Sequence, residues 1–204
     1  TSMEIDDLST PAVLIEERRM ASNIERMQEK ADSEEVRLRP HVKTHKCPAL
    51  GRRQLKAGAP GITVANVHEA EVFVEAGFAD VRLAYSIVGR DKHRRLLALQ
   101  DRADISFCVD TMTGIQEAAE FYQAQDAVGH VLLEIDVGHG RCGVPWNSAE
   151  VAVLADSIVE HPGLQLEGIL THAGHSYAGP TDDEDLVEAL ERVSTDERDR
   201  VLFA

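Results

Sequence analysis

Short apolar segments alternate with helix-like segments along most of the chain, and this alternation is the feature that most constrains the fold. Segments typical of strands lie at residues 36–42, 61–65, 81–85, 105–109, 130–135 and 166–171. Helical patterns follow them at residues 48–57, 66–77, 91–100, 111–124, 148–160 and 183–193. Six consecutive βα units predict an α/β protein with a parallel sheet and helices packed outside it.

The two ends of the chain carry weaker signals. The apolar run at residues 12–15 predicts another strand, and residues 17–31 predict a helix. The last residues, DRVLFA (199–204), are expected to begin a further strand.

Two architectures place helices around a parallel sheet: a doubly wound sheet and a (β/α)8 barrel. The doubly wound fold that binds nucleotides usually carries a phosphate loop, and no strand here is followed by GxGxxG or GxxxxGK[ST]. We therefore expect a TIM-type barrel. Six βα units are visible and a closed barrel needs eight, so the expected barrel is incomplete.

Charge and composition exclude several classes of partner. The net charge of −15 argues against nucleic acid binding, which needs clustered lysine and arginine. No apolar run approaches the roughly 18 residues of a membrane span, and the acidic N-terminus does not resemble a signal peptide. We expect a cytoplasmic protein without membrane contact, and the diffuse acidity with few lysines favours a salt-loving organism. Three widely spaced cysteines predict neither a zinc site nor a disulfide framework.

Polar side chains gather where the predicted strands end. In barrel enzymes the active site is built from the loops at this end of the strands. The residues at these positions are Lys43, His45, Asn66, His68, Tyr85, Ser86, Asp110, Asp136, His139, Arg141, His172, His175 and Tyr177. Their repetition over six units predicts a catalytic rather than a purely structural scaffold.

Ordinary roles account for some of these residues. We expect a solvated side chain at Lys46, a surface histidine at His68, a loop-ordering ring at His45, a helix cap at Asp110 and a largely buried ring at Tyr85.

Lys43 and Arg141 are harder to explain structurally. The strand pattern directs Lys43 toward the barrel mouth, and a buried lysine is costly unless it is paired or used covalently. Arg141 follows two close glycines in GHGRCG, where the backbone can approach a ligand. A lysine and an arginine at a barrel mouth suggest Schiff-base chemistry, either with a carbonyl substrate or with pyridoxal phosphate (PLP).

Three segments, RPHVKTHK, EIDVGHGRCGV and GILTHAGHSYAG, resemble the alanine racemase-like, fold-type III PLP enzymes. The resemblance is to the D-threonine aldolase and D-serine dehydratase branch, and it runs from Ser9 to about Gly179. It implies that residues 1–204 are the N-terminal PLP-binding barrel domain of such an enzyme.

The resemblance also implies roles for individual residues. Lys43 matches the catalytic lysine that forms a Schiff base with PLP, and Arg141 matches the arginine at the phenolic oxygen of the cofactor. His172 matches a histidine near the cofactor ring, with a catalytic role, and His175 and Tyr177 lie in the loop that continues the cofactor site. The implied reaction is cleavage of Cα–Cβ in a D-β-hydroxy amino acid, or loss of water and then ammonia.

Members of that branch are nearly twice as long as this chain. Their later half carries the last barrel strands, a phosphate loop and a C-terminal β domain with the ligands of a divalent metal, so we expect no metal ligands here. Four alternatives stay open: an active lyase or its N-terminal portion, an amino-acid racemase, a non-catalytic PLP-binding protein, and an inactive truncated remnant. We expect a homo-oligomer or association with the missing half.

Overall fold

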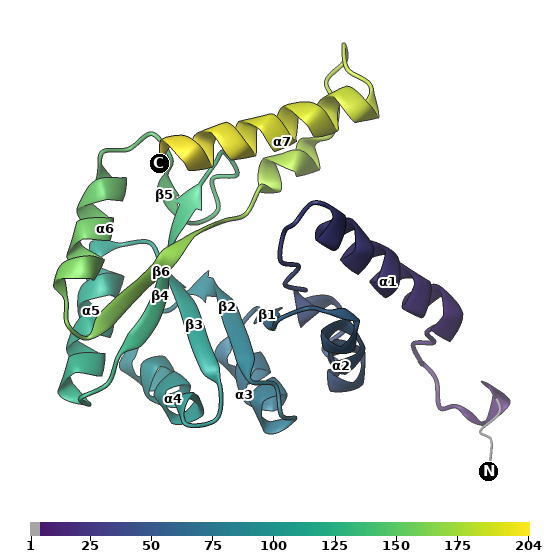
Figure 1. Ribbon diagram of the computed structural model, residues 1–204, viewed down its shortest axis with the longest axis horizontal. Helices are drawn as coiled ribbons and strands as arrows, with labels where there is room; N and C mark the ends of the chain where they lie inside the picture. Colours follow the sequence, from purple (N-terminus) through teal and green to yellow (C-terminus); the bar gives the residue numbers. More distant parts are fainter. Residues whose placement is uncertain (1–4) are drawn as a thin grey trace.

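The computed structural model describes residues 5–204, and the alternating segments form a curved parallel sheet with helices along its outer side (Figure 1). Residues 1–4, the start of the acidic N-terminal stretch, lie outside the described residues. The strands are β1 (Ile62–Val64), β2 (Asp80–Ser86), β3 (Asp104–Val109), β4 (Gly129–Asp136), β5 (Val144–Pro145) and β6 (Leu164–Thr171).

The helices begin near the predicted positions, the last one runs ten residues beyond its predicted end, and three short 3-10 turns are added. The α-helices are α1 (Glu17–Ser33), α2 (Pro48–Ala57), α3 (Val67–Glu75), α4 (Arg90–Gln100), α5 (Met112–Ala124), α6 (Glu150–Glu160) and α7 (Leu186–Phe203). The 3-10 turns are η1 (Ile5–Asp7), η2 (Val42–Thr44) and η3 (Gly174–Ala178).

The strands pair in the order expected of a barrel. β1, β2, β3 and β4 are parallel neighbours in sequence order, and β6 pairs with β4. The two-residue β5 pairs only with the end of β4 and was not expected from the sequence. Within the described residues no strand joins β6 back to β1, so the sheet is open. The prediction of an incomplete barrel of about six units is confirmed.

Alternation along each strand separates an apolar outer face from a polar inner face. Val81 and Leu83 of β2 and Phe107 of β3 are fully buried in the core between the sheet and its helices. The intervening residues, such as Arg82 and Ser106, lie on the inner face, where their side chains hydrogen-bond to one another. The core therefore lies outside the barrel wall, and the inner face presents polar groups.

Two helix boundaries follow directly from local sequence. α2 begins at Pro48, the position that tolerates a missing N–H, and ends before Gly58. The side chain of Asn66 caps α3, since its oxygen accepts the N–H of Glu69 at 2.9 Å. Gly77, with φ of 90°, follows the end of that helix as predicted.

The first predicted strand, residues 36–42, is wrong. Only a single bridge joins His41 to Thr63, supported by the N–H of Thr63, which donates to the carbonyl of Pro40 at 2.8 Å. Pro40 has no N–H to contribute to a ladder, and the chain turns into η2 directly after His41. The segment still lies beside β1, in the place of the barrel's first strand.

Two terminal predictions are also wrong. Residues 12–15 are extended but pair with no strand of the described chain, and Val13 is 92% exposed. Residues 199–203 continue α7 and form no strand. A capping box between Asp185 and Glu188 starts this helix, and its charged, helix-favouring sequence carries it to Phe203.

The C-terminal end of α7 packs against the loop that follows β4. Arg200 donates to the carbonyl of Val137 at 2.6 Å, and its guanidinium lies 5.8 Å from the ring centre of Trp146. The rings of Trp146 and Phe203 meet edge to face at 5.2 Å. Figure 1 shows α7 crossing this end of the sheet, so the helix braces the loop that carries Arg141.

Candidate active site

A cluster of three rings lies at the carboxyl ends of β4 and β6. The Tyr177 hydroxyl lies 3.1 Å from Nε2 of His172, and the two ring centres are 5.6 Å apart. His139 meets His172 edge to face at 5.4 Å and Tyr177 at 5.7 Å. Two loops that are far apart in sequence thus converge on His172.

Lys43 lies in η2, and its side chain is exposed. The expectation of a buried lysine is wrong, because the strand that was to carry it stops at His41. The sheet is also open on this side, so nothing in the described chain covers the lysine. His41 caps η2, since its Nδ1 accepts the Lys43 N–H at 3.4 Å. Burial lowers the pKa of His41, and the charge of Lys43 lowers it further.

His172 is surrounded by positive charge. Burial lowers its pKa, and the charges of Arg141, His139 and Lys43 lower it further. The imidazole is therefore neutral at pH 7. The effect of both Arg141 and Lys43 on one ring shows that these three predicted residues share a single electrostatic environment. Their roles toward a cofactor stay predictions.

The loop after β4 is wound around the carboxylate of Asp136. This carboxylate accepts the backbone N–H groups of Gly138 at 2.9 Å, His139 at 2.8 Å and Gly140 at 2.9 Å. Burial alone would raise the pKa of Asp136, but these three donors outweigh it, and the pKa lies below its ordinary value. His139 and Arg141 both belong to this loop, and both lower the pKa of His172.

Two further contacts close the loop. Gly174 lies so near His139 that a Cβ there would come within 2.4 Å of the imidazole, so only glycine fits. The carboxylate of Asp110 accepts the N–H of Gly143 at 3.1 Å, which means that Asp110 is not the helix cap we expected. Thr111 caps α5 instead, because its hydroxyl oxygen accepts the N–H of Gly114.

A buried carboxylate, which the sequence reading did not single out, lies on the inner face beside this loop. Glu134 of β4 is 2% exposed, and it accepts hydrogen bonds from Cys142 and Ser86. The sequence does carry a signal for it. Glu134 is an acid inside the apolar run VLLEI, two residues before Asp136 on the same strand face.

The other residues singled out in the sequence differ in burial and in their contacts. Both ring nitrogens of His175 are buried without a hydrogen-bond partner in the described chain, and the ring lies near Gly138. Lys46 is mostly exposed but pairs with the buried Glu69 at 3.3 Å. His45 accepts the N–H of Cys47, which agrees with its expected role in ordering the loop. Tyr85 is exposed rather than largely buried.

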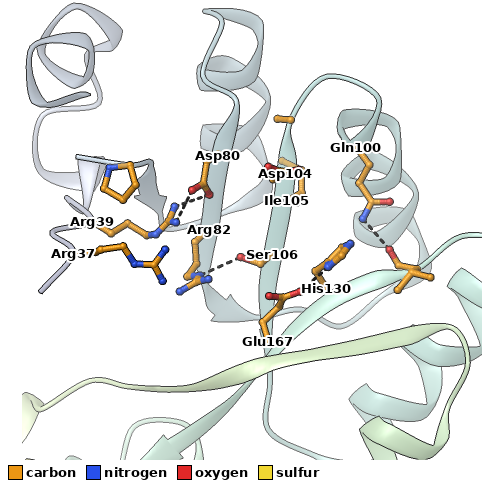
Figure 2. A pocket seen from close by; sticks show the side chains of 13 residues that line it. Arg37, Arg39, Asp80, Arg82, Gln100, Asp104, Ile105, Ser106, His130 and Glu167 are labelled. Atoms are coloured by element: carbon orange, nitrogen blue, oxygen red, sulfur yellow. Dashed lines mark hydrogen bonds and ion pairs between the residues drawn. The ribbon is translucent and has the colours of Figure 1, made fainter. Parts of the chain in front are cut away.

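A cavity of about 670 Å³ lies elsewhere, among the first halves of the strands. Figure 2 shows Arg39 clamped to Asp80, Arg82 on Ser106, and His130 beside Glu167. These side chains belong to the inner face at the amino ends of the strands, whereas Lys43 lies at the carboxyl ends. The cavity is therefore separate from the candidate site.

Residues 5–204 hold neither a metal-binding cluster nor a membrane-spanning helix. No three His, Cys, Asp or Glu side chains are arranged to hold a metal ion. None of the helices in this part of the chain is both long and apolar enough to cross a membrane.

Known proteins resemble this chain over most of its length. It is 39% identical to D-threo-3-hydroxyaspartate dehydratase of Delftia sp. (strain HT23), over 94% of this chain and 49% of the relative. It is 38% identical to D-threonine aldolase of Arthrobacter sp., over 82% of this chain and 44% of the relative. The solved structure of the Delftia dehydratase has a TM-score of 0.84, with 37% identity over 96% of this chain and 50% of the other.

The chain thus spans about half the length of the curated relatives it matches. The family described as "Alanine racemase, N-terminal domain" matches residues 15–198, which extends the similarity well past the expected limit at Gly179. The open parallel barrel, its order of strands and this match agree, and the chain belongs to the alanine racemase N-terminal domain family.

Proposed function

We propose that residues 1–204 are the PLP-binding barrel domain of a lyase that acts on D-β-hydroxy amino acids. One observation carries the proposal: the ring of His172, whose pKa Arg141 and Lys43 both lower, lies against His139 and Tyr177 at the carboxyl ends of the strands. The names of two relatives, a D-threo-3-hydroxyaspartate dehydratase and a D-threonine aldolase, support this substrate class.

The residues at this site fit an anionic pyridine cofactor. Lys43 and Arg141 supply positive charge, and their side chains are exposed and accessible. His172 supplies a flat, neutral ring that Tyr177 and His139 hold in place. PLP, when bound, supplies an electron sink for bonds to Cα of an amino acid.

Each residue has a proposed task toward that cofactor. Lys43 would hold it through its ε-amine, and the guanidinium of Arg141 would donate to its phenolic oxygen. His172 packs at its ring and holds or moves a proton at Nε2, with the Tyr177 hydroxyl as the hydrogen-bond partner of that nitrogen. His175 supports the same loop from beneath, next to Gly138.

The partners of the whole protein belong to the same proposal. A divalent metal is held by ligands outside residues 1–204 and engages the substrate hydroxyl. The open edges of the sheet make this chain associate with a second copy or with the remaining half of the barrel. Sixteen arginines against five lysines, together with the net charge of −15, support a cytoplasmic protein of a salt-loving organism.

The experiment is to purify the 204-residue chain in high salt and to titrate it with PLP, following absorbance. Glycine release from D-threonine with a divalent metal is measured in parallel. We expect weak PLP binding through Lys43 and little or no turnover by this chain alone. Tight binding with turnover by a monomer would show that the rest of the relatives' length is not needed. Absence of any PLP absorbance change would refute the cofactor assignment.

A further inference from the structure

Glu134 has no part in the proposed chemistry, yet it is a charged side chain buried at the edge of the site. Its neighbours in β4, Leu133 and Ile135, point outward into the core, so Glu134 points to the inner face. A buried carboxylate without compensating donors is costly, and its position must be stabilised by what it binds.

Two uncharged donors satisfy this carboxylate. The hydroxyl of Ser86, at the end of β2, donates to Oε2 at 3.2 Å. The thiol of Cys142, in the loop after β4, donates to Oε1 at 2.9 Å. Glu134 therefore links two separate strand ends through one side chain.

Cys142 directly follows Arg141, the arginine predicted to bind the cofactor. The pKa of Arg141 is raised, first by its hydrogen bond with the Cys142 side chain and further by the charges of Cys142 and Glu134. The S–H of Cys142 itself donates to the carboxylate. Hydrogen bonds thus link Ser86, Glu134 and Cys142, and Arg141 is the residue next to Cys142 in the chain.

We propose that Glu134 is a positioning residue: by binding the thiol of Cys142 and the hydroxyl of Ser86 it fixes the loop from which the neighbouring Arg141 reaches the carboxyl ends of the strands. This inference rests on the proposed function for its meaning, but the geometry exists without any cofactor. A carboxylate beside the thiol disfavours the thiolate, which would lose the S–H donor and face a like charge. In agreement, burial raises the pKa of Cys142 and the hydrogen bond to Glu134 raises it further, and together they outweigh the lowering effect of Arg141.

The first test follows the thiol in the absence of PLP. Cys47→Ser removes one other cysteine, and Cys108 is fully buried. The rate of alkylation of Cys142 by iodoacetamide is measured from pH 7 to 10, with peptide mapping. Glu134→Gln keeps the shape and removes the charge, so we expect about tenfold faster alkylation at pH 8, one unit of pKa. Glu160→Gln, an exposed acid on α6, is the matched control and should change nothing.

A structural role alone predicts a different outcome. If Glu134 only fills space, Glu134→Gln alkylates within twofold of the parent chain at every pH, and the inference is wrong. Circular dichroism shows whether the variant folds. Should it not fold, Cys142→Ser and Cys142→Ala decide the question through the absorbance of bound PLP. Serine retains an O–H donor for Glu134 and alanine does not.

The second test uses bound PLP. Cys142→Ala and Glu134→Gln should each shift its absorbance in the same direction as Arg141→Lys, and Cys142→Ser should restore it. The double variant Glu134→Gln/Arg141→Lys should shift no further than Arg141→Lys alone. Additive shifts would show that Glu134 does not act through Arg141 and would contradict the inference. A chain in which Glu134→Gln speeds alkylation of Cys142 but which binds no PLP would refute the proposed function and leave the positioning role of Glu134 intact.

Discussion

The hydroxyl oxygen of Tyr177 lies 3.1 Å from Nε2 of His172. The two residues are joined by the short turn η3, so a local hydrogen bond fixes the orientation of the ring on which Arg141 and Lys43 act. The neutral state of His172 makes its Nε2 available as an acceptor of that hydroxyl.

Tyr177→Phe removes this hydrogen bond and keeps the ring. We expect a loss of about 0.5–1.5 kcal/mol, or roughly a 2- to 10-fold fall in PLP affinity, because His172 no longer holds one orientation. Absorbance titration measures it. Tyr85→Phe, near the end of β2, is the control. Equal affinity in Tyr177→Phe and the parent chain would separate Tyr177 from the site.

The pKa of His172 reports on the site without any cofactor. Arg141 and Lys43 both lower this pKa, so Arg141→Ala and Lys43→Ala should each raise it toward 6.5, with the larger rise for Arg141→Ala. A proton NMR titration of the histidine ring signals measures the change, and His172→Gln assigns the signal. Arg198→Ala, an exposed residue of α7, should leave it unchanged. If the pKa of His172 is the same in both site variants as in the parent chain, Arg141 and Lys43 do not act on this ring.

We expect the hydrogen bonds to the Asp136 carboxylate to stabilise the loop after β4. Asp136→Ala leaves three backbone N–H groups without their acceptor, and we expect a loss of about 1–3 kcal/mol in unfolding free energy. Urea unfolding measures it, with Asp156→Ala on the exposed face of α6 as control. A loss no larger than the control's would contradict a stabilising role of Asp136 in the loop.

A buried histidine in the core predicts that the free energy of unfolding depends on pH. His93 is completely buried among the rings of Phe107, Phe121 and Tyr122, and neither of its nitrogens has a hydrogen-bond partner within residues 5–204. Burial lowers its pKa; the charge of Glu117 opposes this, while Lys92 and Arg90 add to it. The unfolded chain therefore binds the proton more readily, and unfolding free energy should fall as pH drops below about 6.5.

Urea unfolding at pH 8, 6.5 and 5 tests this, with His93→Leu as the comparison. The variant should lose less stability than the parent chain between pH 8 and 5, because carboxylates titrate alike in both. Parallel losses in the two chains would show that His93 does not cause the dependence.

Sequence predicted the parts of this fold that local rules determine. α2 begins at a proline and ends at a glycine, and Asn66 caps α3, because propensity and capping act over a few residues. Residues 36–42 failed because a strand needs partners on its edges, and periodicity does not reveal that Pro40 breaks the ladder.

The site shows the same division. His172 and Tyr177 follow strand ends and meet as expected, since parallel strands bring their carboxyl ends together. The exposure of Lys43 depended on where the preceding strand stops, which the pattern misjudged. Glu134 escaped notice because its burial is visible only once Ser86 and Cys142 are known to surround it.

The most direct measurement of the account is the site of covalent PLP attachment. The 204-residue chain is incubated with PLP in high salt, reduced with borohydride, digested and mapped by mass spectrometry. We predict the label on Lys43, its loss in Lys43→Ala, and its retention in Lys46→Ala, because Lys46 is paired with Glu69. Label on Lys46 with full PLP binding by Lys43→Ala would contradict the assignment of the site.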